Sequence, residues 1–368
     1  MMAEEFVSAD SHVVEPADLW TTRMDKKFRE RAPRIDSRPD GDYYIIEGLD
    51  PTPLGLEGAM LEDKLRGGVE SSTGHRHSDT RPGAWNGEAR LVDQDLDHIR
   101  AEVIYPGLFG LQFFTAPDPE YQRECIRVYN DWLSELSAVA PNRFLGAALL
   151  PMKGPAEWAV AEAERAAKNN LRSVMMAAEA RYQSSEYDRL WAALQDLGLP
   201  VSVHVGTSTQ EAVFAKFRRM GIGTGLVDTK LGMPIRTVAD LIWSGVPQRY
   251  PKLRFVIVEG GTGWIVSLLT FMDHWWADHR GWMQPKLNEA PSTYFHRQFW
   301  ATFEDDRAGL LTRELMNVEH LMWGSDYPHT EGTFPHSREQ VAKVFAGIPN
   351  SEVRMMVADN AARLYGVV

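Results

Sequence analysis

Short apolar segments separated by helical patterns recur along the whole chain, and this alternation restricts the fold more than any other feature. Each segment is rich in β-branched residues and ends in a polar or glycine-containing cluster. Such strands pair in parallel, with both faces of the sheet covered by helices. Eight of these units favour a (β/α)8 TIM barrel, although an open doubly wound sheet gives a similar alternation. The segments are residues 6–13, 101–107, 143–150, 172–177, 201–206, 254–261, 299–304 and 320–326.

Three connections are longer than a minimal barrel needs. Residues 14–88 form a long insertion, rich in proline, glycine and charge, between the first strand and its helix. Residues 207–235 are glycine-rich, and residues 271–298 are rich in tryptophan and histidine. Because the loops after the strands build the active-site face of a barrel, we expect these segments to form its walls or a lid. Residues 351–365 predict a C-terminal helix that closes the barrel, capped by Ser351.

Composition and charge exclude several classes of protein. Lys and Arg total 39 against 51 Asp and Glu, and the resulting net charge of −12 disfavours a nucleic-acid partner. No apolar run approaches the ~20 residues that span a bilayer, and the start of the chain lacks a signal-peptide pattern. We therefore expect no membrane partner and a cytoplasmic location. The single cysteine, Cys125, excludes an internal disulfide and fits a buried position in a helix. With no linker visible, residues 1–368 are expected to form one domain.

Four side chains at the carboxyl ends of the predicted strands belong to types that bind metal ions. Asp10 and His12 alternate on the first strand and so point to the same side, while His204 ends the fifth strand and Asp326 ends the eighth. Two imidazoles and two carboxylates suit one divalent ion, with Zn²⁺ expected and Mn²⁺ the alternative, because carboxylates make the site harder. Each residue alone also fits a structural role, as a core histidine or a loop-capping aspartate.

Other polar residues each have a functional and a structural interpretation. Arg76 and Arg81 lie in a loop rich in serine, glycine and aspartate, where they either bind an anionic substrate from a lid or remain solvated. His329, three residues after Asp326, is a candidate second acid or base. Residues 304–306, two aspartates and a glutamate, either support a metal ligand or cap the following helix.

Taken in order, these motifs resemble one known family. The chain is similar to the amidohydrolase-related branch of the amidohydrolase superfamily, which includes aminocarboxymuconate-semialdehyde, γ-resorcylate and 5-carboxyvanillate decarboxylases. The resemblance implies a metal-dependent enzyme with a distorted (β/α)8 barrel, and it implies a homodimer. It covers nearly the whole chain and rests on Asp10-Ser11-His12-Val13-Val14-Glu15-Pro16, His204-Val205-Gly206, Glu259-Gly260-Gly261, Trp323-Gly324-Ser325-Asp326-Tyr327-Pro328-His329 and Asn360-Ala361-Ala362-Arg363-Leu364-Tyr365-Gly366.

The resemblance also implies roles for individual residues. His12 and His204 match metal ligands, and Asp326 matches the aspartate that contacts the metal and transfers a proton. Asp10 stands where the better-known decarboxylases have His or Glu. Glu259 stands on the sixth strand where those decarboxylases have His. We interpret Glu259 as a general base, as a residue that orients a neighbour, or as a helix cap.

Three hypotheses about function follow. The first is a carboxy-lyase that acts on a small aromatic or conjugated carboxylic acid, with Asp326 protonating the carbon that loses CO₂. The second, which Glu259 keeps open, is hydrolysis of an amide, ester or lactone, with Asp326 or Glu259 taking the proton of a water activated by the metal. The third is an inactive barrel that only binds a partner; its signature would be a lost metal ligand, and all four positions keep one.

Overall fold

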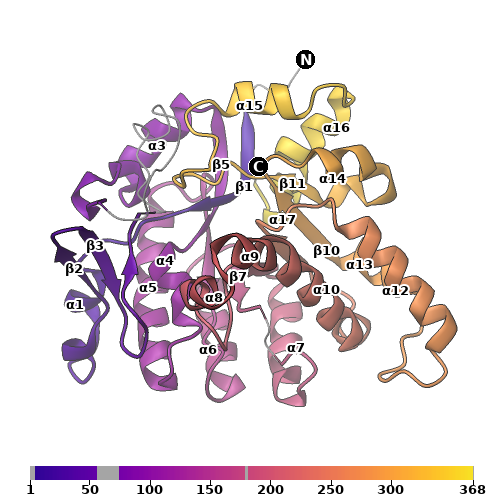
Figure 1. Ribbon diagram of the computed structural model, residues 1–368, viewed down its shortest axis with the longest axis horizontal. Coiled ribbons are helices and arrows are strands. Elements are labelled where there is room, and N and C mark those ends of the chain that lie inside the picture. Colours follow the sequence, from indigo (N-terminus) through magenta and orange to yellow (C-terminus); the bar gives the residue numbers. More distant parts are fainter. Residues whose placement is uncertain (1–4, 56–73, 179–180, 368) are drawn as a thin grey trace.

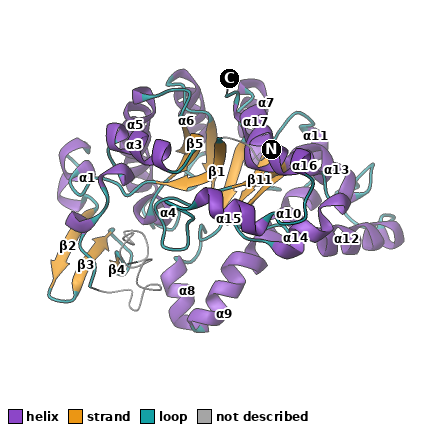
Figure 2. Ribbon diagram, turned by 90° about the horizontal axis from the view of Figure 1, so that it is seen from above, coloured by secondary structure: helices purple, strands orange, loops and turns teal. Residues whose placement is uncertain are grey.

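Eight parallel strands occupy the centre of the computed structural model, and helices surround them (Figure 1 and Figure 2). The structure describes residues 5–55, 74–178 and 181–367. The strands are hydrogen-bonded in the order β1-β5-β6-β7-β8-β9-β10-β11, so each lies beside its successor in the chain. The predicted (β/α)8 barrel is confirmed. The strands are β1 (Phe6–His12), β5 (Ile99–Tyr105), β6 (Phe144–Leu149), β7 (Ser173–Met176), β8 (Val201–His204), β9 (Phe255–Val258), β10 (Phe299–Phe303) and β11 (Leu321–Trp323).

The first and last strands meet at a joint that is held by a few hydrogen bonds. In the described chain β1 and β11 are the two ends of the ladder, and a single bridge, between Ser11 and Tyr327, links them. The His12 amide donates to the Tyr327 carbonyl over 2.5 Å, and the Asp326 amide donates to the Asp10 carbonyl over 2.9 Å. We call this contact between residues 8–12 and 323–327 the closing joint.

The helices follow the strands as the sequence predicts. In α5, for example, the Asp118 carboxylate caps the first turn by accepting from the Glu120 and Tyr121 amides. Among the described residues, the α-helices ahead of residue 350 are α1 (Leu19–Arg23), α3 (Gly87–Leu96), α4 (Leu108–Phe113), α5 (Pro119–Val139), α6 (Ala156–Lys168), α7 (Asp188–Leu197), α8 (Val213–Met220), α9 (Ile222–Val227), α10 (Met233–Trp243), α11 (Val246–Arg249), α12 (Ile265–His279), α13 (Pro291–Gln298), α14 (Arg307–Thr312) and α15 (Ser337–Val344).

The predicted closing helix covers the closing joint from outside. It runs without a break through α16 (Asn350–Arg354), a π-helical turn η8 (Met355–Asp359) and α17 (Asn360–Tyr365), and η8 packs against both β1 and β11. The Asn360 amide group donates to the Leu321 carbonyl over 2.8 Å and so ties the helix to β11. The predicted Ser351 cap is wrong, because the helix already begins at Asn350, after Pro349.

The long insertion after β1 contains a small antiparallel sheet beside α1 (Figure 1). Its strands are β2 (Arg34–Arg38), β3 (Gly41–Ile45) and β4 (Thr52–Pro53). Asp50 of this insertion pairs with Arg218 of α8, so the insertion contacts the connection that follows β8. Residues 56–73 of the predicted insertion lie outside the described residues, and the lid role of residues 14–88 stays a prediction.

The tryptophan-rich segment 271–298 lies at the opposite end of the barrel from the expected face. Gln248 of α11, which precedes the start of β9, donates to the Lys286 carbonyl over 3.2 Å and accepts from the Asn288 amide over 2.7 Å. The segment therefore lies near the amino ends of the strands. The expectation of an active-site wall is wrong. Helix α12 runs from the end of β9 back toward the start of β10, so the segment that begins within it lies at that end of the barrel.

The buried position predicted for Cys125 is confirmed. Cys125 is buried in α5, and burial raises the pKa of its thiol well above the usual range. Within the described parts of the chain, none of the helices combines the length and the apolar character needed to cross a membrane.

Gly324 is expected to be essential to the closing joint for steric reasons. A Cβ atom added there would lie 3.1 Å from the Asp10 amide nitrogen and 3.2 Å from the Asp10 Cα, and still closer to its Cβ. We expect Gly324→Ala to lower the free energy of unfolding by about 1–3 kcal/mol, measured by chemical denaturation. The matched control is Gly223→Ala in α9, where the added Cβ meets nothing within 4 Å. An equal loss of stability in both variants would contradict this account.

Candidate metal centre

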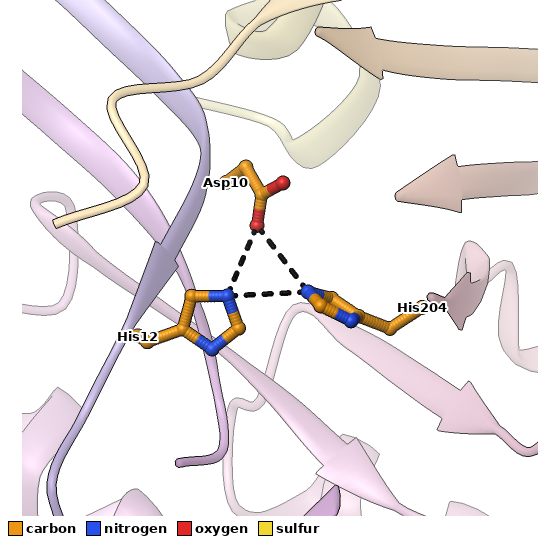
Figure 3. A group of neighbouring side chains, drawn as sticks. All are labelled: Asp10, His12 and His204. Carbon is orange, nitrogen blue, oxygen red and sulfur yellow. Dashed lines mark hydrogen bonds and ion pairs between the residues drawn. The ribbon is translucent and has the colours of Figure 1, made fainter. Parts of the chain in front are cut away.

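The four predicted metal ligands come together at the carboxyl ends of the strands. Asp10 and His12 extend from β1, His204 ends β8, and Asp326 follows β11, and all four are at most 1% exposed. The side chains of Asp10, His12 and His204 converge on one centre (Figure 3). The two Nε2 atoms lie 3.1 Å apart and are 3.6 and 3.7 Å from Asp10 Oδ1, while His12 Nε2 is 3.3 Å from Asp326 Oδ1.

Backbone carbonyls fix which nitrogen of each histidine faces this centre. His12 Nδ1 lies 2.7 Å from the Pro106 carbonyl, and His204 Nδ1 lies 2.7 Å from the Val205 carbonyl. Because a carbonyl only accepts, both Nδ1 atoms carry the hydrogen and both Nε2 lone pairs face the centre. Two such acceptors repel each other unless a cation lies between them. Burial and the neighbouring His329 lower the pKa of His12 to about 4, so this ring is neutral, as a metal ligand must be.

The carboxylates of the cluster also fit a cation. Asp10 Oδ1 and Asp326 Oδ2 are buried without a hydrogen-bond partner among the described residues. A buried acceptor left this way costs about 1–3 kcal/mol, and more when it is charged. Donor atoms 2.0–2.2 Å from a tetrahedral ion are about 3.3–3.6 Å apart, and the observed separations of 3.1–3.7 Å bracket that range. The residues present therefore suit one divalent cation.

Two of the acidic residues adopt a backbone conformation that is rare outside glycine. Glu259, after β9, has φ 64°, and Asp326, after β11, has φ 54°. Such left-handed residues store strain and cluster at functional sites. Thr302 of β10 links the two sides of the centre, because its hydroxyl accepts from the Glu259 amide over 2.7 Å and donates to Asp10 Oδ2 over 3.2 Å. Both strand ends thus turn sharply and aim a carboxylate inward.

Glu259 lies beside the metal centre and forms an ion pair with a lysine. Its Oε2 is 3.3 Å from His204 Nε2, and its Oε1 pairs with Lys230 Nζ. Lys230 lies in a π-helical turn, η5 (Asp228–Gly232), and is 3.9 Å from Glu331 Oε1. Sequence reasoning missed Lys230 and Glu331. The one signal for Lys230 was its place in the long connection 207–235, which does not reveal which loop residue folds back onto the site.

His329 is placed next to Asp326, as the sequence suggested. Its Nδ1 lies 3.0 Å from Asp326 Oδ1, and its ring stacks on that of His12 with 4.1 Å between centroids. Burial alone would raise the pKa of Asp326, but the neighbouring His329 outweighs it and holds that pKa well below the usual range. Burial and the negative charge of Asp326 raise the pKa of Glu304 well above its usual range. Neighbouring acidic groups at the centre therefore have pKa values shifted in opposite directions.

The remaining predicted residues interact with other parts of the protein. Arg76 pairs with Asp42 over 3.0 Å, and Arg81 Nε lies 2.7 Å from Asp93 Oδ2, so each guanidinium has a carboxylate partner within the chain. A substrate-binding role for the two arginines stays a prediction. Asp306 caps α14 by accepting from the Gly309 amide over 2.9 Å, which matches the helix-cap interpretation of this residue.

Known proteins resemble this chain in sequence and in fold. The model of the amidohydrolase family matches residues 75–367. A γ-resorcylate decarboxylase from Polaromonas sp. is 25% identical over 271 residues, which cover 65% of this chain and 78% of that protein. An amidohydrolase structure from Mycobacterium avium subsp. paratuberculosis has a TM-score of 0.79 at 23% identity, covering 98% of this chain and 99% of that chain. A dihydroxybenzoic acid decarboxylase from Polaromonas sp., solved with bound manganese and the inhibitor 2-nitroresorcinol, has a TM-score of 0.65 at 16% identity, covering 99% of this chain and 97% of that chain.

The centre predicts a measurable metal content. After incubation with Zn²⁺ or Mn²⁺, we expect about one ion per chain by elemental mass spectrometry. His12→Ala combined with Asp326→Asn removes two of four ligands and should abolish retention of the ion. The control is His320→Ala, because burial also lowers the pKa of His320 to about 4 but this residue precedes β11 at the other end of the strand. A folded wild-type protein that takes up neither ion would rule out the metal centre.

Proposed function

The chain belongs to the amidohydrolase family, and from this premise we propose that it is a decarboxylase of a small aromatic or conjugated carboxylic acid. It is a metal-dependent enzyme with decarboxylases among its relatives. The observation that carries the proposal is the Asp326–His329 pair, which places a proton-carrying group against a buried metal-ligand carboxylate. The similarity to γ-resorcylate decarboxylase supports the choice of an aromatic acid.

The chemistry follows from what each residue can do with a proton. The ion, when bound, would hold the substrate carboxylate together with an adjacent oxygen and withdraw electron density. When the bond between the ring carbon and the carboxylate breaks, both bonding electrons stay on the ring carbon. CO₂ leaves, and the ring carbon takes up a proton. His329 Nδ1 lies 3.0 Å from Asp326 Oδ1, so the two groups can pass a proton between them. In this scheme Asp326, the group nearer the centre, gives the proton to the carbon, and His329 replaces it.

Zn²⁺ is our first expectation for the ion, and Mn²⁺ is the alternative. Two carboxylate ligands favour the harder Mn²⁺, and the Polaromonas enzyme with bound manganese supports this alternative. We further propose one domain and a homodimer on the resemblance alone. The substrate is a small anion, and the cytoplasmic location stays a prediction.

Release of CO₂ tests the proposed reaction. We expect protein loaded with Zn²⁺ or Mn²⁺ to release CO₂ from acids of the 2,6-dihydroxybenzoate type in a time course. Asp326→Asn keeps the shape of the side chain and removes the proton transfer, so we expect kcat to fall about 10²–10⁴-fold. Turnover of an ester, lactone or amide panel without turnover of the acids would end the decarboxylase proposal.

One observation favours a second candidate function, metal-dependent hydrolysis. Glu259 occupies the position where the decarboxylases it resembles have His, and its Oε2 lies 3.3 Å from His204 Nε2. Lys230 holds the other carboxylate oxygen and favours the ionised form of Glu259. An ionised carboxylate in this position can accept a proton from an attacking water, which a decarboxylase does not need.

Replacement of Glu259 distinguishes the two reactions. Glu259→Gln keeps the shape and removes the basic group. For a decarboxylase we expect kcat on the acid panel to change by less than about tenfold, whereas loss of a general base lowers kcat about 10²–10⁴-fold. Glu331→Gln is the control, because Glu331 also approaches Lys230 but is half-exposed. A large loss confined to Glu259→Gln would favour the hydrolase.

A further inference from the structure

Three of the four metal ligands lie on the closing joint. Asp10 and His12 lie on its β1 side, and Asp326 lies on its other side, after β11. β1 also carries a bulge, since it advances from Ser8 to Ser11 while β5 advances only from Glu102 to Ile104. Bulges bend a strand and redirect its side chains. A regular strand ladder therefore does not by itself fix the distance between these ligands.

Arg90 of α3 is fully buried against this joint and contacts both of its sides. Its Nη1 donates to the His12 carbonyl over 2.8 Å and to the Gly83 carbonyl over 3.3 Å. Its guanidinium carbon lies 4.8 Å from the ring centroid of Tyr327, the residue after Asp326. A single side chain thus contacts the backbone of one metal ligand and the immediate neighbour of another.

The partners of Arg90 are themselves held in place. Its Nε pairs with Glu102 of β5, whose Oε1 also accepts from the Gln94 amide group over 2.7 Å. On the other side, the Tyr327 hydroxyl donates to Asp93 Oδ2 over 2.6 Å. These contacts hold the guanidinium through its Nε and Nη1 atoms, while Nη2 is buried with no hydrogen-bond partner among the described residues.

We propose that Arg90 is a positioning residue for the metal centre, which sets the separation of His12 and Asp326 without touching the ion. A guanidinium is planar and presents several donors in a fixed fork, so it can bond a carbonyl and a carboxylate while lying on a ring. A lysine at this position keeps the charge opposite Glu102 but has a single compact donor group. It cannot contact His12 and Tyr327 at the same time.

Metal affinity and metal geometry test the role of Arg90 without any substrate. In the full chain carrying Arg90→Lys, we expect Mn²⁺ to bind about 10–100-fold more weakly, measured by the electron paramagnetic resonance of free Mn²⁺. We also expect the visible absorption spectrum of the Co²⁺-loaded variant to differ from that of the wild type. The matched control is Arg313→Lys, because Arg313 is also buried and paired, with Glu352 and the Leu310 carbonyl of the outer helices.

The outcomes separate positioning from general stability. Affinity and spectrum altered in Arg90→Lys but normal in Arg313→Lys would support the proposal even if both variants melt at lower temperature. If Arg90→Lys does not fold, Tyr327→Leu removes the stacked ring, keeps the ion pair, and should weaken Mn²⁺ binding by a smaller factor. The proposal would be overturned if folded Arg90→Lys kept the affinity and spectrum of the wild type. The same result in Tyr327→Leu would overturn it where that variant replaces Arg90→Lys. Equal changes in Arg313→Lys would also overturn it. A wild type that binds neither ion would overturn the metal centre as well, whereas a metal-binding wild type that releases no CO₂ would contradict the decarboxylase alone.

Discussion

The meeting of β1 and β11 is the constraint on which the rest of this structure depends. Ser8 and Ser325, which are 317 residues apart in the sequence, have hydroxyl oxygens 3.2 Å apart across the closing joint. Nearly the whole chain must therefore fold before Asp10 and His12 meet Asp326, and such long-range contacts are slow and entropically costly to form. An ion that binds ligands from both strands binds only the closed barrel. Its binding free energy then stabilises the joint by mass action.

Acidic groups around the centre are kept in different states by different neighbours. His329 holds the pKa of Asp326 well below its usual range despite burial, whereas burial and the negative charge of Asp326 raise the pKa of Glu304 well above its usual range. Glu259 differs from both, because it forms an ion pair with Lys230. Groups whose environments push their pKa values apart are the ones that divide acid from base roles in an active site. The charge pattern of this centre is therefore as specific as its ligand geometry.

The barrel and the convergence of the candidate metal ligands were predictable because both depend on local pattern. Apolar segments identified the strands, and the rule that barrel sites lie at strand ends then selected His204 and Asp326 from many polar residues. Lys230 and Arg90 were not predictable, since each reaches the centre from a helix or loop whose path depends on tertiary packing. The error over residues 271–298 has a related cause. Composition indicated an aromatic surface, but the direction in which α12 runs decides at which end of the barrel that surface lies.

Glu259, the residue after β9, is the position at which the lyase and hydrolase hypotheses differ. A fold of this type supports both reactions, because His12, His204 and Asp326 can hold an ion for either one. What differs is the direction of proton flow: a decarboxylase must give a proton to carbon, and a hydrolase must first take one from water. The Asp326–His329 pair suits the first task, and the Glu259 carboxylate suits the second. Lys230 approaches both Glu259 and Glu331, so its charge keeps a carboxylate partner when Glu259 accepts a proton, and the position after β9 is compatible with either direction of proton flow.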